Sequence, residues 1–411
     1  MKYILIIGDG MADNGVAELG GKTPLQAAEK PAIDAMAAKS QLGHALTVPK
    51  ILPPGSDTAI LSIFGCDPCK YFTGRSPLEA AGCGVTVEPG CASYRCNMIC
   101  LEDGDKPFNE KVILSHNAGS IDGETSMAVI RQLCADPEFH AAMEELGMSI
   151  EPTPSFRHIA MQKNGDISGI VLKPPHDILG QVIGDYAFYG NANAKKLWSL
   201  MELANKKLEH LPLNEQRRAA GKKPANGIWF WAEGTSVKLP SFVENYGHGG
   251  SVISAVPLVH GIGVLTGLKM ITVEGATGEV DTNYAGKLQA AKDALAAGDE
   301  FLCVHLEAPD ESTHNGSLSD KLLAINQLDQ LIVAPLTAWM EEQGMDYRLL
   351  LLSDHKTLMS SRTHDGDPVP YLIYDSTKPL NTGLSYTEEN GEKGPYVEPG
   401  TKLMDLLFEK Q

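Results

Sequence analysis

The chain alternates short, uniformly apolar runs with amphipathic stretches, which is typical of strands joined by helices. The runs at residues 2–7, 301–306 and 349–352 are apolar without polar alternation. This pattern predicts strands that are buried on both faces of a parallel sheet. Helical periodicity over residues 24–39 and 282–297 supplies two of the helices that would cover such a sheet. The pattern therefore predicts an α/β fold with a mostly parallel sheet sandwiched by helices.

The pattern of predicted secondary structure changes between about residues 85 and 185. Short strand-like pieces there alternate with turns, and residues 122–146 carry helical periodicity. We therefore expect a smaller inserted α+β domain over residues 85–185, with residues 1–84 and 186–411 forming the core. A length of 411 residues also favours more than one domain.

Composition excludes several classes of partner. The formal net charge of −18 argues against nucleic acid and against anionic membranes, because both need a basic binding surface. No apolar run approaches the roughly 18 residues of a membrane span. The first apolar run is interrupted by Gly8 and Asp9, which is typical of a strand rather than a signal peptide, and eight cysteines fit reduced thiols. We therefore expect a cytoplasmic protein. Cys66 and Cys69 have redox or zinc spacing, but no second such pair follows.

An aspartate follows each of the three apolar runs: Asp9, Asp310 and Asp354. Each alone would also fit a turn or a helix cap. In a parallel sheet, however, the carboxyl ends of the strands lie along one edge, where α/β proteins place their ligands. We therefore expect the three carboxylates to converge.

Three histidines accompany these aspartates, namely His314, His355 and His364, and Ser56 begins a predicted helix after a Pro-Pro-Gly turn. Together these side chains could hold two metal ions. Mixed nitrogen and oxygen ligands suit Zn²⁺ or Mn²⁺ better than Mg²⁺. A two-metal site can activate a nucleophile and stabilise a leaving oxygen, which is the chemistry of phosphoryl transfer.

The motifs that carry these residues keep a characteristic order along nearly the whole chain. They are Asp9-Gly10, Pro54-Gly55-Ser56-Asp57, Gly74-Arg75-x-Pro77-Leu78-Glu79-Ala80, Glu307-Ala308-Pro309-Asp310-x-x-x-His314, Asp354-His355 and His364-x-x-Asp367-Pro368-Val369-Pro370. In these motifs the chain resembles the archaeal-type, cofactor-independent phosphoglycerate mutases of the alkaline phosphatase superfamily. The resemblance implies an alkaline-phosphatase-like core with an inserted domain that caps the substrate.

The resemblance also implies roles for individual residues. Ser56 would be the nucleophile and form a phosphoserine. One metal ion would be held by Asp9, Ser56, Asp354 and His355, and the other by Asp310, His314 and His364. The implied metals are Mn²⁺ first, with Zn²⁺, Co²⁺ or Mg²⁺ as alternatives, without 2,3-bisphosphoglycerate and without a nucleotide. The implied reaction is the glycolytic interconversion of 3-phosphoglycerate and 2-phosphoglycerate.

A small phosphorylated substrate needs cationic side chains for its phosphate and carboxylate groups. The candidates are Arg75, Arg157, Arg217 and Lys321, with His176 and Asp177 for proton transfer to the glycerate hydroxyls. The sequence leaves a homo-oligomer open.

Two departures from the family pattern concern the substrate pocket. The chain has Trp231-Ala232-Glu233-Gly234 where the family usually has Trp-Gly-Gln-Gly, and Glu311-Ser312-Thr313-His314 where the family favours Glu-Ala-Gly-His. One alternative is therefore a metal-dependent phosphohydrolase or phosphotransferase of the same superfamily, acting on another small phosphate ester. A second alternative is a metal-binding protein without turnover. The chain has no glycine-rich nucleotide loop that would support a kinase.

Overall fold

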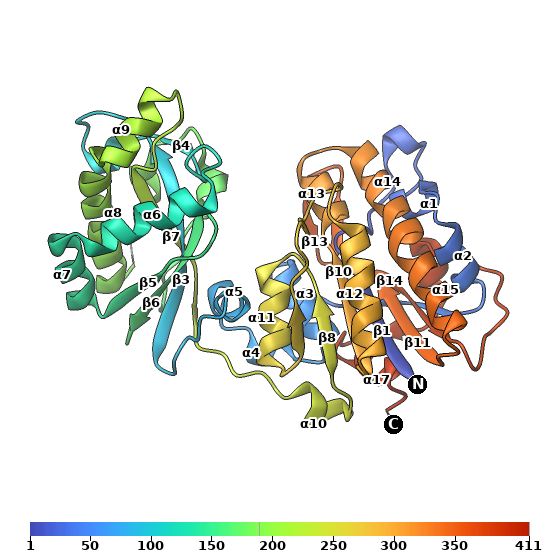
Figure 1. Cartoon of the computed structure of the whole chain (residues 1–411). Helices are drawn as coiled ribbons and strands as arrows, with labels where there is room; N and C mark the ends of the chain where they lie inside the picture. The colour runs from blue at the N-terminus through green and yellow to red at the C-terminus, as the bar shows by residue number, and fades with distance from the viewer. Residues whose placement is uncertain (189, 411) are drawn as a thin grey trace. The chain divides into compact units, whose positions relative to one another are not determined.

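A computed structural model describes residues 1–188 and 190–410 of the chain. The chain divides into two compact units (Figure 1). The core unit comprises Met1–Phe72 and Lys238–Gln411, and the inserted unit comprises Thr73–Val237.

The core unit is built on a mixed sheet with the strand order β15-β2-β14-β11-β1-β10-β8-β9. Its strands are β1 (Lys2–Gly8), β2 (Gln41–Ala45), β8 (Gly250–Ile253), β9 (Lys269–Ile271), β10 (Phe301–Leu306), β11 (Tyr347–Leu352), β14 (Val369–Asp375) and β15 (Tyr396–Val397). Strands β11, β1, β10, β8 and β9 run parallel, whereas β14 is antiparallel to both β11 and β2. The expected mostly parallel sheet is thus confirmed.

Strand β1 lies at the centre of this sheet. Ile6 is in register with Val304 of β10 on one side and with Leu351 of β11 on the other. These side chains are all fully buried, as uniformly apolar strands require. The three apolar runs of the sequence are therefore neighbouring strands, and their carboxyl ends lie together at one edge of the sheet.

Helices cover the core sheet, with α12, α14 and α15 lying close together (Figure 1). The helices of this unit are η1 (Ala17–Leu19), α1 (Pro24–Ala27), α2 (Pro31–Ala37), α3 (Ser56–Ile63), α4 (Pro68–Tyr71), α10 (Phe242–Tyr246), α11 (Pro257–Leu265), α12 (Tyr284–Ala296), α13 (Ala308–His314), α14 (Leu318–Gln327), η5 (Leu328–Val333), α15 (Ala334–Glu342), α16 (Glu388–Glu392) and α17 (Lys402–Leu407). A short hairpin of β12 (Lys356–Leu358) and β13 (Thr363–Asp365) follows β11. Among the residues the structure describes, no helix is long and apolar enough to cross a membrane.

The inserted unit has its own antiparallel sheet, in which the long strand β3 pairs with β4, β6 and β7. Its strands are β3 (Cys91–Leu101), β4 (Ile113–Ser115), β5 (Met148–Glu151), β6 (Arg157–Lys163) and β7 (Gly227–Thr235). Its helices are α5 (Arg75–Gly82), η2 (Phe108–Glu110), α6 (Gly123–Ala135), α7 (Pro137–Leu146), η3 (Pro175–Ile178), η4 (Ile183–Tyr186), α8 (Ala192–Glu209) and α9 (Pro212–Ala219). A separate cluster of buried apolar side chains forms its core.

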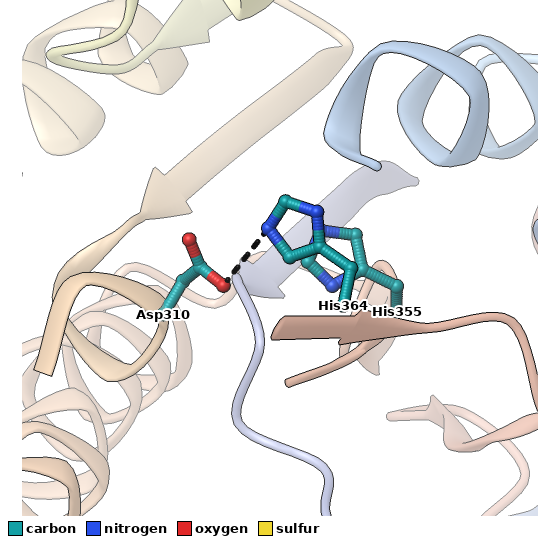
Figure 2. Close-up of side chains that lie close together, drawn as sticks. All are labelled: Asp310, His355 and His364. Carbon is teal, nitrogen blue, oxygen red and sulfur yellow. Dashed lines mark ion pairs between the residues drawn. The ribbon is translucent and has the colours of Figure 1, made fainter. Parts of the chain in front are cut away.

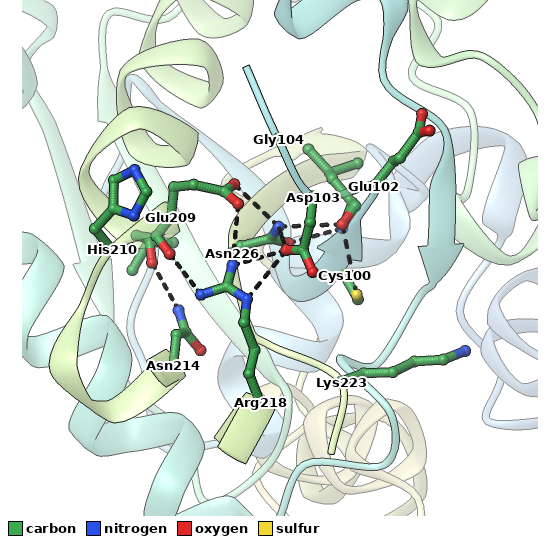
Figure 3. A network of polar contacts seen from close by, with 12 residues as sticks. Cys100, Glu102, Asp103, Gly104, Glu209, His210, Asn214, Arg218, Lys223 and Asn226 are labelled. Carbon is green, nitrogen blue, oxygen red and sulfur yellow. Dashed lines mark hydrogen bonds and ion pairs between the residues drawn. The ribbon is translucent and has the colours of Figure 1, made fainter. Parts of the chain in front are cut away.

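A polar network ties α8 and α9 to the sheet of the inserted unit (Figure 3). Arg218 of α9 forms ion pairs with Asp103 at 2.7 Å and with Glu209 at 3.0 Å. Asn226, just before β7, donates to Glu209 and to the carbonyl of Leu101 at the end of β3. These contacts explain why the segment from α8 to β7 belongs to the inserted unit.

Two details differ from the sequence-based expectations. The inserted unit runs from Thr73 to Val237 rather than from residue 85 to residue 185, because α8 packs on β7 and β7 pairs with β3. The helix expected over residues 24–39 is two helices, because α1 ends at Ala27 and α2 begins at Pro31 and ends at Ala37. Proline cannot donate a backbone hydrogen bond within a helix but is favoured in the first turn.

Candidate metal centre

The segments that directly follow three neighbouring strands bring the aspartates together. Asp9 follows β1 directly, Asp310 lies in α13 after β10, and Asp354 follows β11. All three side chains are buried. The backbone N–H of Gly10 donates to Asp354 Oδ1 at 3.1 Å, which joins the loops after β1 and β11. The geometry agrees with the expectation that these carboxylates converge.

Asp9, Asp354 and His355 form one group whose ligand atoms lie within 4.8 Å of one another. His355 Nε2 is 3.6 Å from Asp9 Oδ1 and 3.3 Å from Asp354 Oδ2. Ser56 joins this group, because its Oγ lies 3.2 Å from His355 Nε2 and 3.4 Å from Asp9 Oδ2. Ser56 is the first residue of α3, where free backbone N–H groups favour an anion.

Asp310, His355 and His364 form a second group that shares His355 with the first (Figure 2). His364 Nε2 lies 3.5 Å from Asp310 Oδ1. His314 extends this group, since its Nε2 is 3.1 Å from Asp310 Oδ2 and 3.0 Å from His364 Nε2. Its Nδ1 faces the carbonyl of Arg362 at 2.9 Å, and this contact leaves the Nε2 lone pair for a metal ion.

The residues of the first group fit a divalent cation. Asp9 Oδ1 and Asp354 Oδ2 are buried oxygens without a hydrogen-bond partner among the described residues. Such orphaned acceptors are costly unless an ion or another ligand satisfies them. Burial, followed by the charges of Asp354 and Asp310, raises the pKa of Asp9 well above its usual value. A bound cation would relieve both the desolvation and the repulsion.

The second group has a different electrostatic balance. Burial alone would raise the pKa of Asp310, but hydrogen bonds with His314 and His364 hold it well below its usual value. The same contact with Asp310 raises the pKa of His314 to about 9. A cation bound here would take the place of the proton that His314 otherwise carries. One carboxylate and imidazole nitrogens form a donor set that suits Mn²⁺, Zn²⁺ or Co²⁺.

In the inserted unit, arginines gather around Glu79 of α5. Arg75 Nε lies 2.7 Å from Glu79 Oε1, and Arg95 Nε lies 2.8 Å from Glu79 Oε2. The charge of Arg157 also lowers the pKa of Glu79, after Arg95 and Arg75 and against the opposing effect of burial. Arg95 is 2% exposed, and its guanidinium carbon lies 4.0 Å from the ring centroid of Trp231. Among the described residues, its Nη2 has no hydrogen-bond partner. Three arginines thus lie around one glutamate in this unit.

His176 and Asp177 lie in η3, and their side chains are about half exposed. The His176 ring meets the edge of Trp231 with a centroid separation of 5.3 Å, which places it near Arg95. Burial, against the opposing charge of Asp177, lowers the pKa of His176 to about 4. His176 is therefore neutral at pH 7 and a weaker base than an ordinary imidazole.

The two other cationic candidates have structural partners. Arg217 donates to the backbone carbonyls of Lys223 and Ala118 and is 7% exposed. Lys321 is fully buried and donates to Asp13 Oδ2 at 2.8 Å and to the carbonyl of Thr357 at 2.6 Å. These contacts account for both side chains without a substrate.

Sequence reasoning missed three residues that contact the candidate sites. His305 lies in β10 with Nε2 3.0 Å from Asp9 Oδ2, and Thr357 donates to Asp310 Oδ1 at 2.6 Å. Arg95 of β3 lies beside Glu79. His305 and Arg95 each interrupt a run of apolar or small residues, and a lone charged or polar residue in a buried strand was the available signal.

Comparison with known proteins is consistent with this geometry. A family model described as 2,3-bisphosphoglycerate-independent phosphoglycerate mutase matches residues 37–214. The chain is 42% identical to a probable 2,3-bisphosphoglycerate-independent phosphoglycerate mutase of Geobacter sulfurreducens, with 100% of both chains covered. It is 41% identical to the 2,3-bisphosphoglycerate-independent phosphoglycerate mutase of Methanosarcina mazei, covering 96% of this chain and 95% of the relative.

Solved structures show the same fold. A protein of Pyrococcus horikoshii aligns with a TM-score of 0.78 at 27% identity, covering 100% of this chain and 98% of the other. The cofactor-independent phosphoglycerate mutase of Thermoplasma acidophilum aligns with a TM-score of 0.61 at 23% identity, covering 100% and 99%.

Proposed function

The chain belongs to the 2,3-bisphosphoglycerate-independent phosphoglycerate mutases, and we propose that it interconverts 3-phosphoglycerate and 2-phosphoglycerate through a phosphoserine on Ser56. The observation that carries the assignment of Ser56 is its position. Its Oγ lies within 3.4 Å of Asp9 and 3.2 Å of His355, at the first residue of α3. A serine hydroxyl is a weak nucleophile unless its environment activates it.

Two divalent cations are proposed at this centre, one held by Asp9, Ser56, Asp354 and His355 and the other by Asp310, His314 and His364. Such cations supply Lewis acidity, which lowers the pKa of a serine hydroxyl and offsets the charge of a phosphoryl group. The orphaned oxygens of Asp9 and Asp354 support the first set. His355 lies within reach of both groups, so its assignment to the first set rests on its contact with Ser56.

The proposed reaction balances as two phosphoryl transfers. Ser56 Oγ attacks phosphorus, the bond from phosphorus to one glycerate oxygen breaks, and the proton of the Ser56 hydroxyl ends on that glycerate oxygen. The other glycerate hydroxyl then attacks the phosphoserine, loses its proton, and restores the Ser56 hydroxyl. The backbone N–H groups at the start of α3 hold the phosphoryl group during both steps.

Arg75 and Arg157 are proposed to hold anionic groups of the substrate, and Arg95 is added to them. The gathering of three arginines around Glu79 supports this assignment, as does Arg95 Nη2, which has no hydrogen-bond partner among the described residues. Arginine suits it because its planar fork matches carboxylate and phosphate geometry.

His176 and Asp177 are proposed to exchange protons with the glycerate hydroxyls. The place of His176 beside Trp231, whose ring stacks on Arg95, supports this assignment. Substrate binding by Arg217 and Lys321 stays a prediction that their surroundings do not support. Mn²⁺ is proposed as the first choice of metal, and the cytoplasm as the location.

The decisive assay supplies 3-phosphoglycerate with Mn²⁺ and couples 2-phosphoglycerate formation to enolase, while free phosphate is measured in parallel. We expect 2-phosphoglycerate to form without added 2,3-bisphosphoglycerate. Release of phosphate without 2-phosphoglycerate would replace the mutase proposal with a phosphohydrolase. Neither product would point to a protein without turnover.

A further inference from the structure

We propose that His305 is a positioning residue that restricts Asp9 to a single metal-facing oxygen. His305 is a fully buried residue of β10, and its Nε2 lies 3.0 Å from Asp9 Oδ2. The proposal rests on the metal site proposed above, because it concerns how one of its ligands is held.

The direction of this hydrogen bond follows from its two atoms. In the ionised form that would bind a metal ion, Asp9 Oδ2 only accepts, so His305 Nε2 must carry a proton and donate to it. On the other side of the ring, Nδ1 lies 3.0 Å from Ser254 Oγ. Ser254 Oγ already accepts from the N–H of Val256 at 3.0 Å, so its own proton is available for Nδ1. The ring is therefore held in the tautomer that points an N–H at Asp9.

Further contacts fix the support itself. Lys287 Nζ donates to the carbonyl of His305 at 3.2 Å, and His260 Nε2 lies 2.7 Å from the carbonyl of Ser254. Each polar atom of the His305 ring thus has one partner, and rotation of the ring would break both contacts. The position of the N–H that faces Asp9 is set by the fold before any metal ion binds.

The consequence concerns the number of oxygens offered to a metal ion. Asp9 Oδ2 accepts from His305 at 3.0 Å and has a longer contact of 3.4 Å with Ser56 Oγ, whereas Asp9 Oδ1 has no hydrogen-bond partner among the described residues. Asp354 is arranged similarly. Its Oδ1 accepts from the backbone N–H groups of Gly10 and His355, and its Oδ2 has no hydrogen-bond partner among the residues that the structure describes. Each carboxylate therefore presents one oxygen.

Single-oxygen ligands favour small cations with few ligands. Ca²⁺ takes 6–8 oxygen ligands and reaches this number partly through carboxylates that bind with both oxygens, whereas Zn²⁺ and similar transition metals accept four or five mixed ligands. Losing the N–H of His305 would free Asp9 Oδ2 to bind as well. The hydrogen bond from His305 therefore selects against Ca²⁺ at this site.

The test compares His305→Phe, which removes the donor and keeps the ring, with His305→Gln, which offers a side-chain N–H at a similar reach. His260→Phe is the matched control, because His260 belongs to the same network but does not contact Asp9. Mn²⁺ and Ca²⁺ affinities are measured by calorimetry on the metal-free full chain, together with the visible spectrum of the Co²⁺ form and the melting temperature without metal.

We expect His305→Phe to weaken Mn²⁺ binding about 10- to 100-fold, the usual effect of losing a hydrogen bond to a metal ligand. It should also narrow the preference for Mn²⁺ over Ca²⁺ and weaken the Co²⁺ absorption, as a higher coordination number does. His305→Gln should recover most of the affinity, and His260→Phe should retain it. A His305→Phe protein with wild-type Mn²⁺ affinity, Ca²⁺ preference and Co²⁺ spectrum would overturn the proposal.

Two additional variants separate the other outcomes. Asp9→Asn should lose the metal ion at this site. If this variant retained both metal equivalents, Asp9 would not be a ligand. The proposed metal site would then be wrong, independently of the role of His305. If His305→Phe does not fold, Ser254→Ala tests the same hydrogen bond. This variant removes the hydroxyl that contacts His305 Nδ1, so the ring is no longer held with its N–H toward Asp9. Unchanged Mn²⁺ affinity and Ca²⁺ preference in Ser254→Ala would then count against the proposal.

Discussion

Replacement of Lys321 by methionine should destabilise the core unit rather than weaken substrate binding. The ammonium group of Lys321 is fully buried and donates to Asp13 Oδ2 and to the carbonyl of Thr357. Methionine has a similar length and flexibility but no charge and no donor. The substitution therefore removes the cation while leaving little empty volume.

The magnitude follows from what remains behind. Asp13 is 3% exposed, and without Lys321 its charge keeps only N–H donors such as that of Met359. Removing one partner of a buried ion pair costs about 3–5 kcal/mol, because the other charge stays buried without compensation. For a unit of this size each kcal/mol lowers the melting temperature by about 2–4 °C. We therefore expect a loss of roughly 10 °C.

Hydrogen exchange of the β11 amides, followed by mass spectrometry, measures the stability of the core unit separately from the inserted unit. Lys269→Met is the matched control. The Lys269 side chain also forms an ion pair, 2.7 Å from Asp299, but it is 73% exposed. Exposed ion pairs contribute about 0–1 kcal/mol to stability, so this variant should lose little. Steady-state kinetics with 3-phosphoglycerate complete the assay. This reasoning would be refuted if Lys321→Met left the β11 amides as protected from hydrogen exchange as in the wild type but had a tenfold higher KM. Lys321 would then be a substrate-binding residue.

Four further outcomes are expected. Ser56→Ala should abolish turnover while leaving most of the bound metal in elemental analysis, and full activity would remove the phosphoserine step. His364→Ala should lose about one metal equivalent, and retention of two would exclude it as a ligand. Arg157→Ala should raise the KM at least about tenfold, as the loss of a charge-assisted hydrogen bond implies, whereas the exposed Arg131→Ala should not. Burial lowers the pKa of His158 to about 4, so its contribution to stability is complete above its unfolded pKa of about 6.5 and is lost as pH falls toward 4. The free energy of unfolding of the inserted unit should therefore fall by about 3 kcal/mol over that range, and His158→Gln should flatten the dependence.

The core sheet was predictable because its signal is local. The apolar runs that became β1, β10 and β11 contain little besides buried side chains, and the aspartate after each run marks its carboxyl end. Convergence of Asp9, Asp310 and Asp354 then follows from the parallel topology. The comparisons confirm the family, the fold class and the mutase function that the motifs indicated.

Other features depend on contacts that no local pattern reveals. The extent of the inserted unit is set by the pairing of β7 with β3, which lie more than 120 residues apart. The burial of Lys321 depends on Asp13, which is 308 positions away in the sequence. From sequence alone, a lysine in an amphipathic helix is expected to be exposed to solvent unless a buried partner is known. His305 did carry a local signal, because it is a lone polar residue in the otherwise apolar strand β10, but its contact with Asp9 lies 296 positions away in the sequence.

The central place of β1 has a consequence for the order in which the chain acquires structure during synthesis. This strand is the first to be made, yet its neighbours in the sheet begin at Phe301 and Tyr347. The inserted unit, by contrast, is one continuous segment that is complete at Val237. The inserted unit can therefore fold before β10 and β11, the partners of β1, have been synthesised. A ribosome stalled before Phe301, with the chain through Val237 already outside it, should carry a protease-resistant inserted unit beside an N-terminal segment that is still digested.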